Sequence, residues 1–69
     1  MPTVVLNGEP IALPDGATAA DAVRASGVPA GGRGVAIALD GEVVPRAEWN
    51  DTQLPDGGQV EVLQAVQGG

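Results

Sequence analysis

The chain has 69 residues, a formal net charge of −6 and a single aromatic side chain, Trp49, so it can support only one small domain with a thin aliphatic core. Three Arg against nine Asp and Glu argue against a nucleic-acid partner, and the absence of Cys, His and Lys removes the usual nucleophiles, general bases and metal ligands. No apolar run approaches the roughly 20 residues of a membrane span, and no basic, signal-like start is present, so we expect a cytoplasmic protein without a bound metal or cofactor.

The first predicted elements form a β-hairpin. Residues 3–6 are a β-rich run, and Asn7-Gly8 is a strong two-residue turn signal that leads into a returning strand over residues 9–13. Pro10 has no N–H to donate to a neighbouring strand. The returning strand is therefore expected at an edge of the sheet.

A single short helix follows. Thr18 has the chemistry of an N-cap, Asp21 stands where the partner of a capping box belongs, and Gly27 is a natural residue to end the helix. These signals predict a helix over residues 19–26. The residues expected to face the sheet are Ala19, Ala22 and Val23.

The second half of the chain predicts three more strands. Residues 35–39 and 42–44 form a hairpin around the Asp40-Gly41 turn, and the last strand covers residues 59–65. Between them, residues 46–54 are irregular or form a single helical turn.

Runs of strands around one helix indicate an α+β fold, and not a repeating βαβ fold. The simplest architecture is the ubiquitin-like β-grasp, a mixed sheet of about five strands packed on one main helix. We expect a β-grasp domain over residues 1–65 and a flexible tail over residues 66–69, mobile in the free protein.

The tail is the feature most suggestive of function. Glycine lacks Cβ, so a diglycine end can enter a narrow cleft and adopt backbone angles closed to other residues. A terminal carboxylate is inert until it is activated, for example as an acyl-adenylate. We therefore interpret the carboxylate of Gly69 as a group that another protein activates, with Val66, Gln67 and Gly68 as the segment that threads into that protein. The alternative is a frayed terminus without a function.

A second notable segment runs from residue 44 to residue 49. Trp49 is expected to close one end of an aromatic-poor core. Arg46 is expected at the surface, where pairing with Glu48 or Asp51 would contribute under about 1 kcal/mol. The carboxylates fall mostly in predicted turns, which favours turn-forming and solubilising roles over acid–base catalysis.

Residues 36–46 followed by Trp49 resemble the central signature of the thiamin-biosynthesis sulfur carrier family, ThiS. Asp56-Gly57, the strand over residues 60–63 and the ending Gly68-Gly69 fit the same pattern in the same order. The resemblance covers essentially the whole chain.

This resemblance implies a carrier and not a catalyst. In such proteins an E1-like adenylyltransferase uses ATP to adenylate the terminal carboxylate, here that of Gly69. A persulfide sulfur donor then displaces AMP and leaves a thiocarboxylate, and thiazole synthase takes up the sulfur. Arg46 and Leu63 are candidate docking residues for these partners, and the free protein is expected to be a monomer.

Other functions remain open at this point. A molybdopterin-synthase-type small subunit, or a carrier for another pathway, would share the fold and the diglycine ending. A ubiquitin-like protein modifier would use the same activation, although the chain has no Lys on which to build polymers. A plain interaction domain would have an inert tail.

Overall fold

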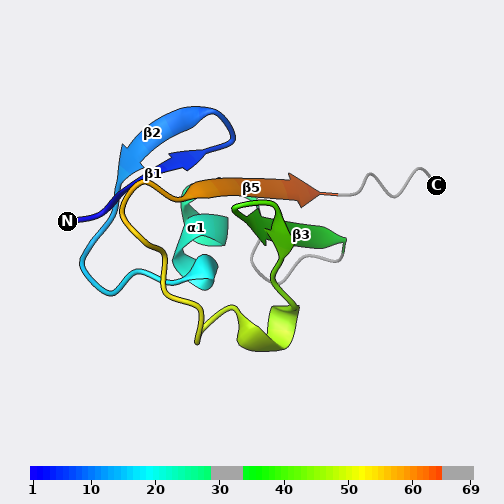
Figure 1. The fold of residues 1–69 in the computed structure, drawn as a ribbon. Helices are drawn as coiled ribbons and strands as arrows, with labels where there is room; N and C mark the ends of the chain where they lie inside the picture. The colour runs from blue at the N-terminus through cyan, green and yellow to red at the C-terminus, as the bar shows by residue number, and fades with distance from the viewer. Residues whose placement is uncertain (29–33, 65–69) are drawn as a thin grey trace.

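A mixed five-stranded sheet packs on one α-helix (Figure 1). The computed structural model describes residues 1–28 and 34–64. Their elements are β1 (Thr3–Leu6), β2 (Glu9–Ala12), α1 (Ala19–Ala25), β3 (Val35–Leu39), β4 (Glu42–Val43), the 3-10 turn η1 (Arg46–Glu48) and β5 (Gln59–Gln64). The predicted order of strands and helix is confirmed.

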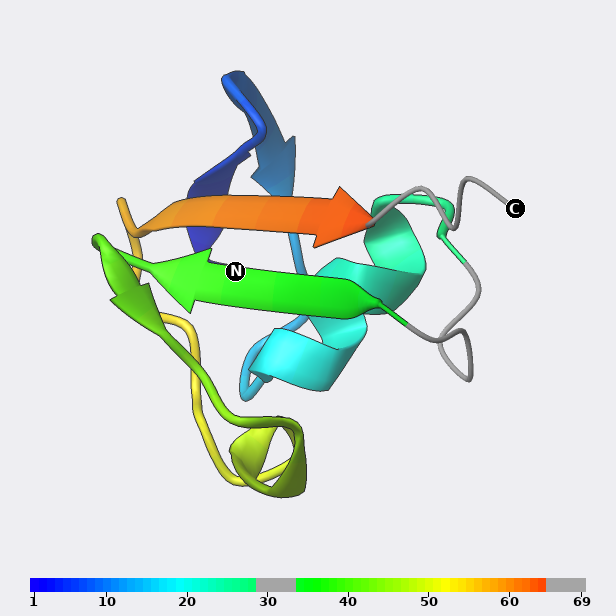
Figure 2. The same cartoon turned by 90° about the vertical axis from the view of Figure 1, so that its right-hand side faces the viewer.

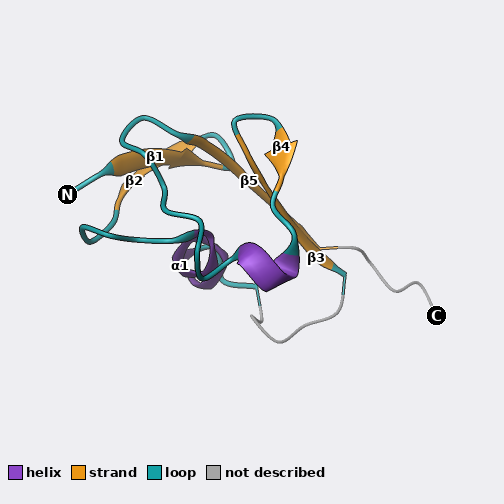
Figure 3. Ribbon diagram, turned by 60° about the horizontal axis from the view of Figure 1, so that its bottom comes forward, coloured by secondary structure: helices purple, strands orange, loops and turns teal. Residues whose placement is uncertain are grey.

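The last strand lies in the middle of the sheet, whose order is β2-β1-β5-β3-β4. β5 runs parallel to β1 and antiparallel to β3, while both hairpins are antiparallel. Figures 2 and 3 show α1 against one face of this sheet, and no helix of the described residues lies on the other. The arrangement is the predicted α+β, ubiquitin-like β-grasp.

Three element ends differ from the prediction by one residue. β2 ends at Ala12 and β4 at Val43, and α1 ends at Ala25 with Ser26 as its C-cap. In the first two cases a proline, Pro14 or Pro45, stands two residues beyond the last strand residue, and proline cannot donate to a ladder. The predicted boundary between residues 65 and 66, and the tail beyond it, lie outside the described residues.

Pro10 occupies the edge position expected of it. It lies opposite Val5, whose N–H points the other way and donates to the Gly58 carbonyl at 2.9 Å. The ring nitrogen of Pro10 therefore faces away from β1, where its missing N–H costs no ladder hydrogen bond and discourages pairing with another chain.

The start of α1 has the predicted capping box. The Asp21 carboxylate accepts hydrogen bonds from the Thr18 backbone N–H at 2.8 Å and from its hydroxyl at 3.3 Å, and it also pairs with Arg24. Mainly because of the Thr18 N–H, and secondarily because of Arg24, the pKa of Asp21 lies below its usual value despite partial burial. Gly27 follows the helix with φ +86°, as predicted for a residue that ends one.

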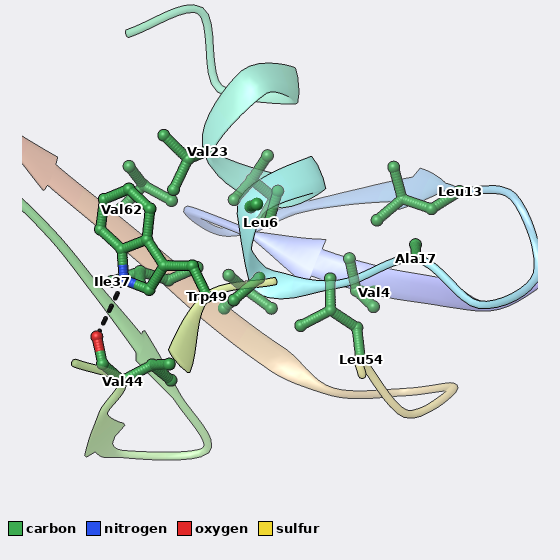
Figure 4. Packing of buried hydrophobic residues seen from close by; sticks show 14 residues of the cluster. Val4, Leu6, Leu13, Ala17, Val23, Ile37, Val44, Trp49, Leu54 and Val62 are labelled. Carbon is green, nitrogen blue, oxygen red and sulfur yellow. Dashed lines mark hydrogen bonds between the residues drawn. The ribbon is translucent and has the colours of Figure 1, made fainter. Parts of the chain in front are cut away.

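The core lies between α1 and the inner face of the sheet. Its buried hydrophobic residues are Val4, Leu6, Leu13, Ala17, Ala19, Ala20, Ala22, Val23, Ile37, Val44, Trp49, Leu54, Val60 and Val62. Small alanine side chains on α1 let the helix approach the sheet closely. Trp49 is 6% exposed, and its indole N–H donates to the Val44 carbonyl at 2.9 Å (Figure 4), which confirms its predicted place in the core.

Within residues 1–28 and 34–64, no helix has both the length and the apolar character needed to cross a membrane.

Candidate functional site

The predicted reactive residue, Gly69, and the threading residues Val66, Gln67 and Gly68 lie outside the described residues. The described part of the site is β5, the strand that leads to them. The contacts that hold β5 are therefore the part of the predicted site that the described residues show.

Every residue of β3 pairs with β5, over residues Val60 to Gln64 of β5. The register runs from Leu39 opposite Val60 to Val35 opposite Gln64. On this side, backbone pairing continues to the last described residue. β5 is therefore supported by a full-length antiparallel neighbour.

The support from β1 is much shorter. Its register with β5 ends at Leu6 opposite Val60, because β1 then enters the hairpin turn. The backbone N–H of Asn7 adds one more bond, to the Val60 carbonyl at 2.9 Å. Beyond this point, backbone of β1 no longer lies beside β5.

The side chain of Asn7 continues the pairing where the backbone stops. Its Oδ1 accepts the N–H of Val62 at 2.8 Å, and its Nδ2 donates to the Val62 carbonyl at 3.2 Å. The primary amide thus imitates the peptide group that a longer β1 would have presented.

The other end of β5 is held in a related way. Asp40, the first turn residue of the second hairpin, accepts the Gln59 N–H through Oδ1 at 2.9 Å, and its own N–H donates to the Gln59 carbonyl at 2.8 Å. Both Asn7 and Asp40 were interpreted from the sequence as turn residues only. The sequence does not predict that their side chains also bind β5, because it shows only a polar residue in a turn next to a strand.

The outer face of the sheet carries exposed apolar side chains near β5. Leu63 is 64% exposed and Val43 is 73% exposed. Leu63 lies opposite Ala36 and Val43 opposite Ala38, two residues apart on β3, so both point to the face that α1 does not cover. The predicted docking residue Leu63 is thus solvent-accessible and close in sequence to the tail.

Arg46 has a different position. It lies on η1, and its guanidinium carbon is 5.3 Å from the centroid of the Trp49 ring, a cation–π distance. Figures 1 and 2 show η1 well apart from β5. The structure therefore does not bring Arg46 and Leu63 together on one surface, and a docking role for Arg46 stays a prediction.

Among the described residues, no group of three or more acidic, His or Cys side chains is placed to hold a metal ion. Three of the described carboxylates have structural contacts: Asp21 caps α1, Asp40 binds β5, and Asp56 Oδ1 accepts the Thr3 N–H at 2.8 Å.

Two comparisons with known proteins find similarity over nearly the whole chain. The sequence profile of the ThiS family matches residues 4–69, which include every described strand but the first residue of β1 and also the diglycine. A similar solved structure is the thiamine biosynthesis protein ThiS from Geobacter metallireducens, with 29% identity, a TM-score of 0.72, and 97% of this chain and 99% of that chain covered. No curated protein sequence matches the chain.

Proposed function

Because this chain belongs to the ThiS family, we propose that it is a sulfur carrier of thiamin biosynthesis whose Gly69 carboxylate becomes a thiocarboxylate. The observation that carries the proposal is the family match over residues 4–69, which runs through the β-grasp domain to the terminal glycine. The ThiS structure from Geobacter metallireducens supports it, since the likeness covers 97% of this chain.

The first step activates the terminus. A carboxylate oxygen of Gly69 attacks the α-phosphorus of ATP in an E1-like adenylyltransferase, and pyrophosphate leaves. The product is an acyl-adenylate with AMP as a good leaving group. ATP is bound by the enzyme and not by the carrier, and its supply favours a cytoplasmic reaction.

The second step exchanges oxygen for sulfur. The terminal sulfur of a persulfide donor attacks the Gly69 carbonyl carbon, AMP leaves, and an acyl disulfide forms. A second thiol then attacks that disulfide, so that a new disulfide forms and the thiocarboxylate is released. Thiazole synthase takes up this sulfur.

In this proposal the C-terminal residues determine how far from the domain the Gly69 carboxylate can reach. If the residues after β5 were fully extended in a partner, about five residues at ~3.3–3.6 Å each could reach at most about 18 Å. Such a length lets Gly69 enter an active site while the domain stays outside. Gly68, without a side chain, fits the narrow approach that such a site needs.

We assign docking on the adenylyltransferase to the outer face of the sheet around Leu63 and Val43. These are, with Met1, the large hydrophobic side chains that the described residues expose. Leu63 is also continuous with the segment that must enter the active site. A partner that binds this apolar face receives the terminus in a defined direction.

The test is intact-protein mass spectrometry after incubation with an E1-like adenylyltransferase, ATP and a persulfide donor. We expect the mass gain of one sulfur replacing one oxygen. The gain should be lost when ATP is omitted, when Gly69 is deleted, and when one residue is added after Gly69. Absence of the gain with the intact chain would overturn the proposal.

A second arm identifies the pathway. The thiocarboxylate form is presented separately to thiazole synthase and to the large subunit of molybdopterin synthase. We expect the sulfur to be lost to thiazole synthase. Loss to the molybdopterin enzyme alone would assign the chain to that pathway, and conjugates on lysines in a lysate would identify a protein modifier.

A further inference from the structure

We propose that Asn7 is a positioning residue for the C-terminal segment: its side-chain amide replaces the missing end of β1 and holds β5 at Val62, so that the terminus leaves the domain from a fixed point. This inference rests on the proposed carrier function and deepens it. It concerns a residue far from the terminus in sequence and outside the reacting groups.

The argument begins with the unequal support of β5. β3 pairs with it as far as Gln64, but the register of β1 stops at Val60. Among the described residues, the Asn7 side chain provides the hydrogen bonds that the structure shows on the β1 side of β5 beyond Val60. It binds both backbone polar groups of Val62, the N–H and the C=O.

Position 7 must meet two separate requirements. The Asn7 backbone has φ +49°, in the left-handed region that Asn, Asp and Gly tolerate best. The side chain must also offer one acceptor and one donor on a short stem. Gly meets only the first requirement, and Asp meets the first while offering an acceptor but no donor. Asn alone meets both.

Asp40 shows that the choice of side chain is local and specific. It has φ +50°, precedes a glycine in the same kind of two-residue turn, and contacts the same strand. At Gln59, however, the carbonyl is already bound by the Asp40 backbone N–H, so the side chain needs only to accept. A carboxylate suffices there, whereas at Val62 an amide is needed.

The functional consequence is a smaller ordering cost when the terminus binds its enzyme. A strand end held on both sides is already in place, whereas one held on one side must be ordered during binding. Loss of the Asn7 contacts should therefore raise KM for the carrier and leave kcat nearly unchanged, because the bound complex is the same.

The experiment compares Asn7→Gly and Asn7→Asp with Asp40→Gly as the matched control. All three keep a turn-compatible residue, and Asp40→Gly removes a side-chain bond at the end of β5 remote from the tail. Amide hydrogen exchange of the free full-length protein and steady-state adenylation kinetics are measured for each. Circular dichroism confirms folding before either measurement.

We expect Asn7→Gly to lower protection of the Val62 amide about tenfold, with a smaller loss in Asn7→Asp, which keeps the acceptor. KM should rise about fivefold in Asn7→Gly with less than a twofold change in kcat. Asp40→Gly should lower protection at Gln59 and leave KM as in the wild type.

Each failure has a distinct meaning. If the wild-type chain is not adenylated, the proposed function is wrong, while the exchange data still test whether Asn7 holds β5. If the wild type reacts and Asn7→Gly has the same KM, Asn7 does not position the terminus. If Asp40→Gly raises KM equally, general loosening of β5 explains the effect and the assignment to Asn7 is overturned.

Discussion

Trp49 shows how much of this small core depends on one side chain. It is the only aromatic residue of the chain, it is buried, and it lies at the end of the core beyond η1. Its ring is covered by Arg46 and its N–H is satisfied by the Val44 carbonyl. An aromatic side chain brings a large buried area, and a buried indole N–H needs a partner; both conditions are met here.

Substitution of Trp49 separates these two contributions. Trp49→Phe keeps much of the area but leaves the Val44 carbonyl without its donor, which should lower the free energy of unfolding by about 1–2 kcal/mol. Trp49→Ala also opens a cavity, and the loss should reach about 3–5 kcal/mol. Urea unfolding followed by far-ultraviolet circular dichroism measures both, with the exposed Leu63→Ala as a control expected within about 0.5 kcal/mol. Equal stability of Trp49→Phe and the wild type would show that the hydrogen bond contributes nothing.

The stability of α1 depends on the residues at its ends. Seven residues are too few for a helix to be stable by itself, so packing of its buried face and capping must hold it. Asp21 contributes at the first turn, where a negative charge is favourable and where it accepts the Thr18 N–H. Its pKa in the folded chain is consequently lowered.

This lowered pKa makes the contribution of Asp21 dependent on pH. Since the folded pKa lies below the unfolded value of about 3.9, the stabilisation is fully present above that value and is lost as pH falls through the folded pKa. Asp21→Asn should therefore lower the free energy of unfolding by about 0.5–1 kcal/mol at pH 7, allowing for solvent screening of this half-exposed pair. The difference between the two proteins should shrink below pH 4.

Denaturant unfolding at pH 7 and at pH 2.5 measures that difference. Asp51→Asn, which changes an exposed carboxylate outside the helix, controls for the change in net charge. A wild-type advantage that persists unchanged at pH 2.5 would show that the Asp21 charge is not its source.

At the scale of the whole molecule, α1 covers one face of the sheet, and the other, called here the open face, carries no helix of the described residues. The helix lies on one side (Figure 3). By their register with β3, Leu63 and Val43 point to the other side, where both are exposed. The net charge of −6 favours solubility, whereas exposed leucine and valine leave apolar area in water that docking would bury. The open face is consistent with the docking role proposed for it.

Leu63→Ser tests that role without disturbing the core. We expect KM for the adenylyltransferase to rise about fivefold, because the variant loses apolar area buried on docking, while the stability changes by less than about 0.5 kcal/mol. The measurement is the steady-state adenylation assay together with urea unfolding. Asp51→Ser, at an exposed position beyond η1, should leave KM unaltered, and an unaltered KM in Leu63→Ser would remove the outer face from the docking surface.

Local chemistry in the sequence determined most of the fold. Two-residue Asn-Gly and Asp-Gly turns specify hairpins, Thr18 and Asp21 specify a helix start, and Gly27 its end, because each signal acts between residues a few positions apart. The ends of β2 and β4 were each predicted one residue too long, because boundaries depend on hydrogen-bond geometry next to prolines. The family resemblance, with the diglycine that it includes, also belongs to the sequence.

Only the tertiary structure decided which distant residues meet. β1 lies beside β5 only because the whole sheet forms. No residue near Asn7 in the sequence therefore predicts its hydrogen bonds to Val62. A short-range pattern specifies the conformation of a turn, but the partner of a turn's side chain depends on the packing of segments that the sequence keeps far apart.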